Sequence, residues 1–307
     1  MSEDRIQEEQ SAETVPAADG VRTDKPGKEK KSVVREILGW VGTLLSAVVL
    51  ALAIRSFLFE LVRVDGASMN DTLQNGEIMF VSKLDYASTW LSLPWQSSEA
   101  KEAAPRLATG IGEPKQFDVV IARYPGRGDT NFVKRLIGMP GDRIRIEDGY
   151  LYVNDQKYEE PYVNDEYRTN AGSPGKDFGE IYVPKKGDEL SLEYVDEAKS
   201  RVGVYVNGGI WIWRGISSEA VSEEGDRLAY HRDGALMLNG EDISSDPEKI
   251  KDLVGRKFTL EKDLYFVMGD HRDSSNDSRS QGPITRDMLV GHVRTVIFPI
   301  GAWRGIQ

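Results

Sequence analysis

The sequence predicts a mainly β protein, with a β-rich body of antiparallel sheets preceded by one N-terminal transmembrane helix. The body is predicted by many short runs of β-branched and aromatic residues, broken by Gly, Pro, Asn and Asp, with little helical periodicity. The helix is predicted by eighteen consecutive residues without a formal charge, 37–54. No second apolar run of comparable length follows, so we expect a single crossing of the membrane.

Residues 1–36 contain no aromatic residue and are rich in charged and small residues, which predicts a disordered cytoplasmic tail. Residues 37–59 are predicted to be a transmembrane anchor, in which Arg55 snorkels toward the membrane surface. Five basic residues against two acidic ones in 25–36 place the tail in the cytoplasm and the body across the membrane. The alternatives are a buried core helix and a cleaved signal peptide; the long polar segment before the run disfavours the latter.

The body is expected to have two parts. Residues 60–154 and 263–307 carry alternating runs and the hairpin signal Asp148-Gly149, and they are predicted to form the core that holds any active site. Residues 155–262 are polar and rich in Gly and Asp, and they are predicted to form an inserted β-rich subdomain. Residues 84–115 include an apolar, Trp-bearing stretch and are expected to be an inserted loop or short helix.

Composition limits the chemistry available to the 307 residues. The mean hydropathy of −0.44 is that of a soluble globular protein and hides the single apolar run. A net charge of −11 provides no basic field for nucleic acid. The absence of cysteine excludes disulfides, thiolate metal sites and cysteine nucleophiles. Only three histidines are present, and His231 and His292 have no acidic or histidine neighbour at ligand spacing. We therefore predict no metal and no cofactor, and a hydrolase of this composition is expected to use a base other than histidine.

Three segments carry side chains suited to catalysis: GASMNDTL (66–73), FVKRLIGMPGD (132–142) and MGDHRDSSNDSRSQG (268–282). Each alone has an ordinary structural explanation. Ser68 could be a turn residue, Lys134 an exposed position on an alternating strand, and the third segment a solvated loop held by Asx-turns.

Together, these segments are consistent with a serine hydrolase that uses a lysine base. A serine nucleophile needs a base within hydrogen-bond reach, and a lysine amine can act as that base once desolvation lowers its pKa. Lys134 lies among Val133, Leu136 and Ile137, a sequence able to form the dry wall of a strand. Ser–Lys pairs are a known variant of the catalytic triad.

The segments resemble the conserved boxes of bacterial type I signal peptidases (peptidase family S26), membrane-bound Ser–Lys proteases that remove signal peptides from exported preproteins. Residues 68–73 resemble the family's Ser-Met-x-Pro-Thr-Leu box, and residues 134–142 match its Lys-Arg-x-x-Gly-x-Pro-Gly-Asp box throughout. Residues 269–282 resemble the Gly-Asp-Asn-Arg-x-x-Ser-x-Asp-Ser-Arg-x-x-Gly box. Asp118 to Pro125 resembles a fourth box, an Asp-Val-Val strand that ends in proline.

The resemblance implies a role for each matching position. Ser68 corresponds to the nucleophile and Lys134 to the general base, with the backbone N–H of Ser68 as the oxyanion donor. Ser275 corresponds to the serine that hydrogen-bonds the lysine amine and orients it. Asp277 and Arg279 correspond to a charged pair that braces this loop beside the site.

Further positions follow from the same resemblance. Asp142 corresponds to the residue that closes the Pro-Gly-Asp turn after the lysine strand. Met69, Phe132 and Val133 are candidates for lining the shallow pockets that accept small residues before the cleavage site. Gly66 stands where some members of the family add a hydroxyl donor, so we expect that donor to be missing.

Two positions depart from the family pattern. Asp71 replaces the proline that follows the nucleophile by three residues, and its charge is expected to favour protonated Lys134, against the low pKa that a base needs. His271 occupies the position of an asparagine, and we expect it to form structural hydrogen bonds rather than to act in catalysis.

The resulting prediction is an enzyme that removes N-terminal signal peptides from exported preproteins. The resemblance implies a single-pass protein of the bacterial cytoplasmic (inner) membrane, with a cytoplasmic N-terminus and an extracytoplasmic body. Its expected partners are preprotein signal peptides and the lipid bilayer, with the protein-export translocon as a candidate and nucleic acid excluded. One alternative is a catalytically impaired, membrane-tethered β-rich binding or assembly module, favoured only by Asp71. Another is a self-cleaving repressor-type Ser–Lys protease, disfavoured by the anchor and the lack of a DNA-binding segment.

Overall fold

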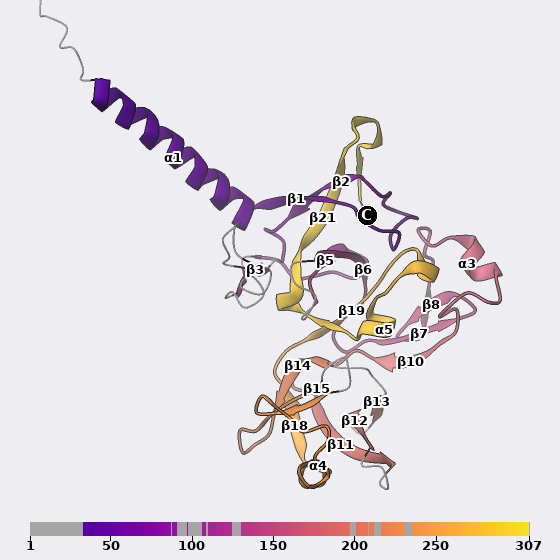
Figure 1. Cartoon of the computed structure of the whole chain (residues 1–307). Coiled ribbons are helices and arrows are strands. Elements are labelled where there is room, and N and C mark those ends of the chain that lie inside the picture. The colour runs from indigo at the N-terminus through magenta and orange to yellow at the C-terminus, as the bar shows by residue number, and fades with distance from the viewer. Residues whose placement is uncertain are drawn as a thin grey trace, which may run out of the picture. The chain divides into compact units, whose positions relative to one another are not determined.

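A computed structural model describes residues 33–86, 88–90, 97, 106–108, 110–124, 130–196, 201–207, 209–211, 216–230 and 235–306. Residues 1–32 of the predicted tail (1–36), the Pro125 end of the fourth box and His231 lie outside the described residues. Residues 33–36 of that predicted tail are helical. The described elements are mainly antiparallel β-strands preceded by one apolar helix, which confirms the predicted fold class (Figure 1).

The N-terminal helix α1 (Val33–Phe57) includes residues 37–57 of the predicted anchor 37–59, and β1 begins at Phe59. Its segment Val33–Arg55 has 23 residues, and an 18-residue window within it has a mean hydropathy of 2.4. At 1.5 Å per residue this segment is about 35 Å long, compared with roughly 30 Å for the hydrocarbon core of a bilayer. The helix is therefore long enough and apolar enough to cross a membrane.

The main sheet carries the segments singled out by the sequence. Within the described residues it runs in the order β1, β2, β21, β5, β6, β19, β20, and β22 pairs with β21. Its strands are β1 (Phe59–Arg63), β2 (Ile78–Ser82), β5 (Val119–Ala122), β6 (Phe132–Gly138), β19 (Leu264–Met268), β20 (Ile284–Thr285), β21 (Leu289–Phe298) and β22 (Arg304–Gly305). The pairs within this sheet are antiparallel, with β6 between β5 and β19.

Two apolar layers cover the faces of the main sheet. Successive residues of β5 point to opposite faces, as strand geometry requires. Val119 and Ile121 belong to one cluster, with Met69 and Leu73, whereas Val120 and Ala122 belong to another. Because both faces are covered, the central strands are runs of apolar residues without polar alternation, and β5 and β19 are buried throughout.

A smaller sheet of four strands follows β6 in the chain and contains the predicted hairpin. It is formed, in order, by β10 (Phe178–Tyr182), β7 (Arg143–Glu147), β8 (Tyr150–Val153) and β9 (Gln156–Tyr158). Asp148 and Gly149 join β7 to β8 with φ angles of 51° and 76°, the left-handed geometry of a tight hairpin turn. The short helix α3 (Asp165–Thr169) follows β9, and Asn164 caps its N-terminus.

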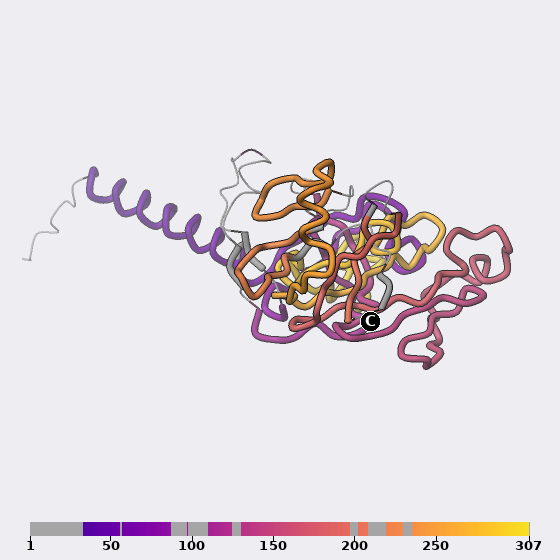
Figure 2. Tube along the Cα trace, turned by 90° about the horizontal axis from the view of Figure 1, so that it is seen from below, coloured from indigo at the N-terminus to yellow at the C-terminus, as the bar shows by residue number. Residues whose placement is uncertain are grey.

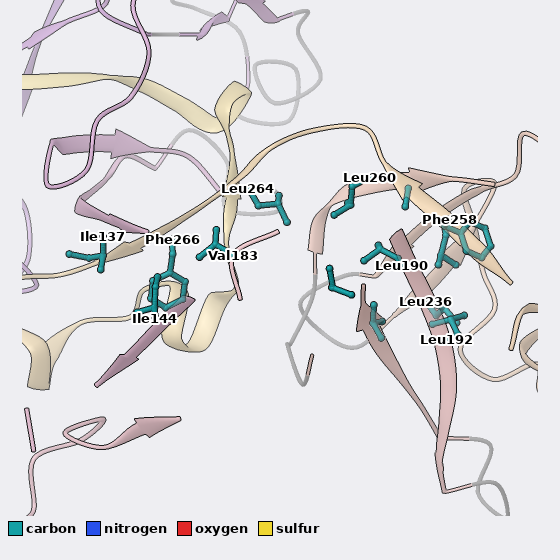
Figure 3. Close-up of a cluster of buried hydrophobic side chains, with 14 of the residues drawn as sticks. Ile137, Ile144, Val183, Leu190, Leu192, Leu236, Phe258, Leu260, Leu264 and Phe266 are labelled. Atoms are coloured by element: carbon teal, nitrogen blue, oxygen red, sulfur yellow. The ribbon is translucent and has the colours of Figure 1, made fainter. Parts of the chain in front are cut away.

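A third sheet is built from residues between 189 and 260. Its strands are, in order, β13 (Gly209–Trp211), β12 (Arg201–Val206), β11 (Glu189–Asp196), β18 (Lys257–Leu260), β14 (Ile216–Val221), β15 (Arg227–Tyr230), β16 (Leu236–Leu238) and β17 (Glu241–Asp242). Helix α4 (Pro247–Leu253) precedes β18. Buried side chains of this sheet, such as Leu190 and Phe258, belong to the same apolar cluster as Ile144 and Phe266 (Figure 3). The division of the body at residues 154 and 262 stays a prediction.

The expectation of a loop or short helix across residues 84–115 was wrong for two short stretches. β3 (Ser88–Trp90) and β4 (Arg106–Ala108) pair as antiparallel strands. The pairing joins segments on either side of the Ala- and Glu-rich stretch. The helix was suggested by the composition of the stretch between the two strands. That composition contains no information on whether the flanking residues pair with each other.

Candidate active site

Ser68 lies on a tight turn that follows β1. The turn is closed by backbone hydrogen bonds from Asn70 N to Ala67 O (3.0 Å) and from Thr72 N to Met69 O (2.8 Å). Met69 and Leu73 are 2% and 0% exposed, so they fix the turn to the apolar layer beneath it. Ser68 itself is partly exposed, and its backbone N–H donates no hydrogen bond to any described residue. The turn therefore presents both a hydroxyl and a free backbone donor.

Lys134 reaches the Ser68 hydroxyl from the middle of β6. Its Nζ donates hydrogen bonds to Ser68 Oγ (2.7 Å) and to the carbonyl oxygen of Val133 (2.9 Å). The residue is 2% exposed. Burial disfavours the ammonium form and lowers the pKa of Lys134 to about 8, from an ordinary value of 10.5. A buried amine with this pKa, in contact with a serine hydroxyl, can act as a general base near neutral pH.

Two buried carboxylates near Lys134 oppose that shift, and each is paired with an arginine. The negative charges of Asp277 and Asp270 act to raise the pKa of Lys134, and the positive charge of Arg279 acts to lower it. Asp270 accepts hydrogen bonds from Arg135 Nε and Nη2 at 2.9 and 2.8 Å. Asp277 accepts hydrogen bonds from Arg279 at 3.0 and 2.9 Å. Although burial acts to raise the pKa of Asp277, the Arg279 guanidinium holds it below its ordinary value.

The loop 269–282 lies against the turn of residues 67–73 that carries Ser68. The backbone N–H of His271 donates to Ser68 O (3.1 Å), and Gly269 N donates to Asp277 Oδ2 (3.0 Å). Thr72 Oγ1 donates to Asp270 Oδ2. These contacts join the backbone of the Ser68 turn to the loop that follows β19.

The same loop is anchored on its other side to the segment before α3. Arg272 and Glu160 form an ion pair in which both side chains are 0% exposed. The Tyr162 ring stacks 3.7 Å from the Arg135 guanidinium. In both views of the chain, the loop after β19 lies beside the α3 segment (Figures 1 and 2).

The remaining predicted residues lie close to this arrangement but differ in their contacts. Ser275 Oγ is buried and makes no hydrogen bond of normal geometry with a described residue, although its hydroxyl acts to lower the pKa of Asp277. The expected hydrogen bond from Ser275 to the Lys134 amine is therefore not among the described contacts. Asp142 Oδ2 accepts from Met139 N (2.7 Å), within the Pro-Gly-Asp turn.

The three predicted pocket residues differ in exposure. Phe132 and Val133 are partly buried at the start of β6. Met69 is buried in the core, and its sulfur accepts a hydrogen bond from Asp270 N (3.4 Å). Phe132 and Val133 are thus the two of the three with surface available to a ligand.

Sequence reasoning missed the partners that hold the site together. Arg135 and Asp270 lie within the quoted boxes, but nothing in either box indicates that they pair. Glu160 lies outside all of the boxes. The signal that could have identified these residues is their type, because charged side chains within apolar strands or fixed turns need a buried partner.

His292 also has neighbours that sequence spacing did not predict. Its Nδ1 lies 3.6 Å from Asp85 and its Nε2 lies 3.6 Å from Asp118, and its ring stacks on Tyr86. Burial lowers the pKa of His292. Among the described residues, no group of three or more His, Cys, Asp or Glu side chains is arranged to hold a metal ion.

Comparison with known proteins gives one consistent family. Residues 37–298 match the family described as signal peptidase, peptidase S26. The chain is 35% identical to Signal peptidase I P from Bacillus subtilis subsp. natto over 282 residues, covering 92% of this chain and 97% of that protein. It is 30% identical to Signal peptidase I from Streptococcus pneumoniae serotype 4, covering 85% and 92% respectively. It is also 36% identical to Signal peptidase I from Bacillus licheniformis, covering 53% and 75%.

Gly269 lies where the loop packs closely against the turn that carries Ser68. A Cβ built on Gly269 would overlap Ser275 Oγ and the backbone oxygen of Ser68. We expect Gly269→Ala to displace Ser68 and lower the rate of peptide cleavage by about 100-fold, because small displacements of reacting groups have effects of that size. Gly301→Ala is the control, since its Cβ would meet nothing within 4 Å. Equal activities of the two variants would contradict this account.

The buried pair Arg135–Asp270 is expected to be needed for folding as well as for the site. Its side chains are 1% and 0% exposed, so Asp270→Asn would remove a buried carboxylate charge that is hydrogen-bonded to the guanidinium. We expect the free energy of unfolding to fall by about 3–5 kcal/mol, measured by denaturant unfolding in detergent. The exposed pair Arg143–Glu180 provides the control, and Glu180→Gln should leave stability nearly unchanged. Similar stabilities of the two variants would show that the buried charge is compensated in another way.

Proposed function

The chain belongs to the signal peptidase family, peptidase S26, and is therefore a peptidase; we propose that it is a membrane-bound serine endopeptidase that cleaves signal peptides from exported preproteins. In this proposal Ser68 is the nucleophile and Lys134 is the general base. The observation that carries it is the 2.7 Å contact between Lys134 Nζ and Ser68 Oγ, made by an amine that is almost completely buried.

The reaction begins with a neutral Lys134 amine that accepts the proton of the Ser68 hydroxyl as Ser68 Oγ attacks the scissile carbonyl carbon. The backbone N–H of Ser68 is free to donate to the oxyanion that forms. The protonated amine then gives its proton to the leaving nitrogen, the peptide bond breaks and an acyl-enzyme remains. Lys134 next takes a proton from water, the resulting hydroxide attacks the ester, and Ser68 recovers its proton.

The loop 269–282 supports this reaction by holding its parts in place. We assign Asp277 and Arg279 to bracing the loop. The Asp277 carboxylate accepts hydrogen bonds from the Arg279 guanidinium and from the Gly269 N–H beside the site. Ser275 lies in the same loop, and we propose that it hydrogen-bonds the lysine amine when substrate is bound. Asp142 closes the turn after β6 through its bond to Met139 N.

The substrate is expected to meet the enzyme at a membrane surface. A chain anchored by residues 37–59, with its body on the extracytoplasmic side of the bacterial inner membrane, would face signal peptides that lie in the same bilayer. Confinement of both to one surface raises their effective concentration. Phe132 and Val133 are the candidates for contacting small side chains before the cleavage site, and the export translocon is a candidate partner.

The alternative of a catalytically impaired binding or assembly module depended on Asp71. The charged groups that act on the pKa of Lys134 are Asp277, Asp270 and Arg279. The Asp71 carboxylate lies instead 4.0 Å from His271. No observation favours the impaired module over the peptidase.

Removal of either reacting group is expected to stop cleavage. We expect Ser68→Ala and Lys134→Ala each to lower the cleavage rate of a peptide containing Ala-x-Ala by at least about 1000-fold, while circular dichroism shows an intact fold. A serine-reactive acylating probe should label the unmodified protein but not Ser68→Ala. Ser274→Ala, which removes an exposed serine of the same loop, should be active and labelled. Retained cleavage by Ser68→Ala would contradict the Ser–Lys mechanism.

The pH dependence of cleavage should follow the protonation of Lys134. Only the neutral amine can accept a proton, so activity is present above the pKa of about 8 and is lost as the pH falls through it. We expect kcat/KM to be half-maximal near pH 8 and to fall by about tenfold per unit at lower pH. The measurement is kcat/KM between pH 5.5 and 9.5. A profile that is flat between pH 6 and 9 would exclude Lys134 as the titrating base.

A further inference from the structure

The two positions at which the sequence departs from the family boxes lie opposite each other in the structure. Asp71 belongs to the nucleophile turn and His271 to the loop that follows β19. Asp71 Oδ1 and His271 Nδ1 are 4.0 Å apart, although the residues are far apart in the sequence. A histidine and a carboxylate at this distance attract each other only when the imidazole is protonated.

Both side chains are partly removed from water. The side chain of Asp71 is 19% exposed and that of His271 is 31% exposed. His271 Nδ1 is buried and has no hydrogen-bond partner among the described residues. Burial raises the pKa of the Asp71 carboxyl, and the charge of His271 acts against that rise. Among the described residues, the His271 nitrogen that faces Asp71 therefore has no hydrogen-bond partner that would compete with Asp71.

The pair is directly linked to the reacting serine. The backbone N–H of His271 donates to the carbonyl oxygen of Ser68 (3.1 Å). Asp71 lies three residues after Ser68, in the turn whose hydrogen bonds fix the position of the hydroxyl. An attraction between the two side chains therefore pulls together the same two backbone segments that this hydrogen bond joins.

The other charged groups around the pair do not replace this interaction. Asp270 and Asp273, from the same loop as His271, act to raise the pKa of Asp71, and the backbone N–H of Asn164 acts to lower it. Asp270 is paired with Arg135. From the segment before α3, Glu160 faces the loop and is paired with Arg272. Among these groups, His271 supplies the positive charge that acts to lower the pKa of Asp71.

From this geometry we propose that Asp71 and His271 are positioning residues whose attraction, when His271 is protonated, holds the nucleophile turn against the loop 269–282. The pair makes the placement of Ser68 dependent on pH, separately from the protonation of Lys134. Acidification then has two opposed effects: it protonates the base and tightens the support of the nucleophile. This inference rests on the proposed function, since it concerns the placement of Ser68 for attack.

The test is the ratio of kcat/KM for the unmodified protein to that for His271→Asn, measured on the full chain in detergent between pH 5.5 and 9.5. Protonation of Lys134 affects both proteins and largely cancels in this ratio. We expect the ratio to be roughly twofold to fivefold larger at pH 6 than at pH 9, the range expected for a partly exposed charge pair. The loss should fall on kcat rather than KM, because the position of Ser68 changes and the substrate pocket does not.

A double-mutant cycle with Asp71→Asn separates the pair from the single side chains. At pH 6, His271→Asn combined with Asp71→Asn should lose no more activity than either variant alone, whereas additive losses would overturn the proposal. If His271→Asn fails to fold, the ratio for Asp71→Asn tests the same interaction. Glu223→Gln is the control and should leave the ratio unchanged, because Glu223 is an exposed carboxylate with no ion pair among the described residues and is not among the groups that act on Asp71.

The outcomes separate this inference from the proposed function. A ratio that is the same at pH 6 and pH 9 would overturn the role of the pair, provided that cleavage still requires Ser68. Cleavage that persists in Ser68→Ala would instead overturn the proposed function. Each result identifies which of the two proposals has failed.

Discussion

The burial of one lysine amine beside a serine hydroxyl is the constraint on which the rest of the site depends. Lowering the pKa of Lys134 from 10.5 to about 8 means that the folded protein binds this proton less tightly than the unfolded chain. Between pH 8 and pH 10.5 the unfolded state holds more protons than the folded state, so the free energy of unfolding rises with pH in this range. The contribution of Lys134 to the free energy of unfolding is therefore about 3 kcal/mol lower at neutral pH than above pH 10.5. The two apolar layers around β5, β6 and β19 supply the burial that offsets this loss.

The acidic residues near the amine show how positioning and electrostatics are reconciled. Asp270 and Asp277 organise the loop 269–282, but unpaired carboxylates at these positions would return the pKa of Lys134 toward its ordinary value. Asp270 is paired with Arg135 and Asp277 with Arg279, and the charge of Arg279 acts in the opposite direction on the pKa of Lys134. Buried ion pairs add little net stability. We therefore attribute to these two pairs the role of fixing the loop while the pKa of Lys134 stays low.

The sequence predicted those features of the fold that depend on residues close together in the chain. The hairpin at Asp148-Gly149 and the apolar runs of β5 and β19 follow from local turn chemistry and composition. Long-range partners could not be predicted in this way, because Arg135 and Asp270 are 135 residues apart and Arg272 and Glu160 are 112 apart. Their pairing depends on the strand order of the main sheet and on the path of the segment before α3. For the same reason the sequence did not predict that Asp85 and Asp118 lie beside His292, since the three residues come from different segments of the chain.

The strand order itself explains why the reacting groups can meet. β6 lies between β5 and β19, so the lysine strand is adjacent to the strand from which the loop 269–282 emerges. The turn that carries Ser68 belongs to neither strand. Met69 and Leu73 anchor it in the apolar layer, and backbone and side-chain contacts join it to that loop. The bond from His271 N to Ser68 O and the bond from Thr72 to Asp270 are two such contacts. Lys134 is therefore fixed by a packed sheet, whereas the position of Ser68 depends on how tightly two loops hold each other. In such a site, substitutions that alter the contact between the loops can adjust activity without disturbing the base.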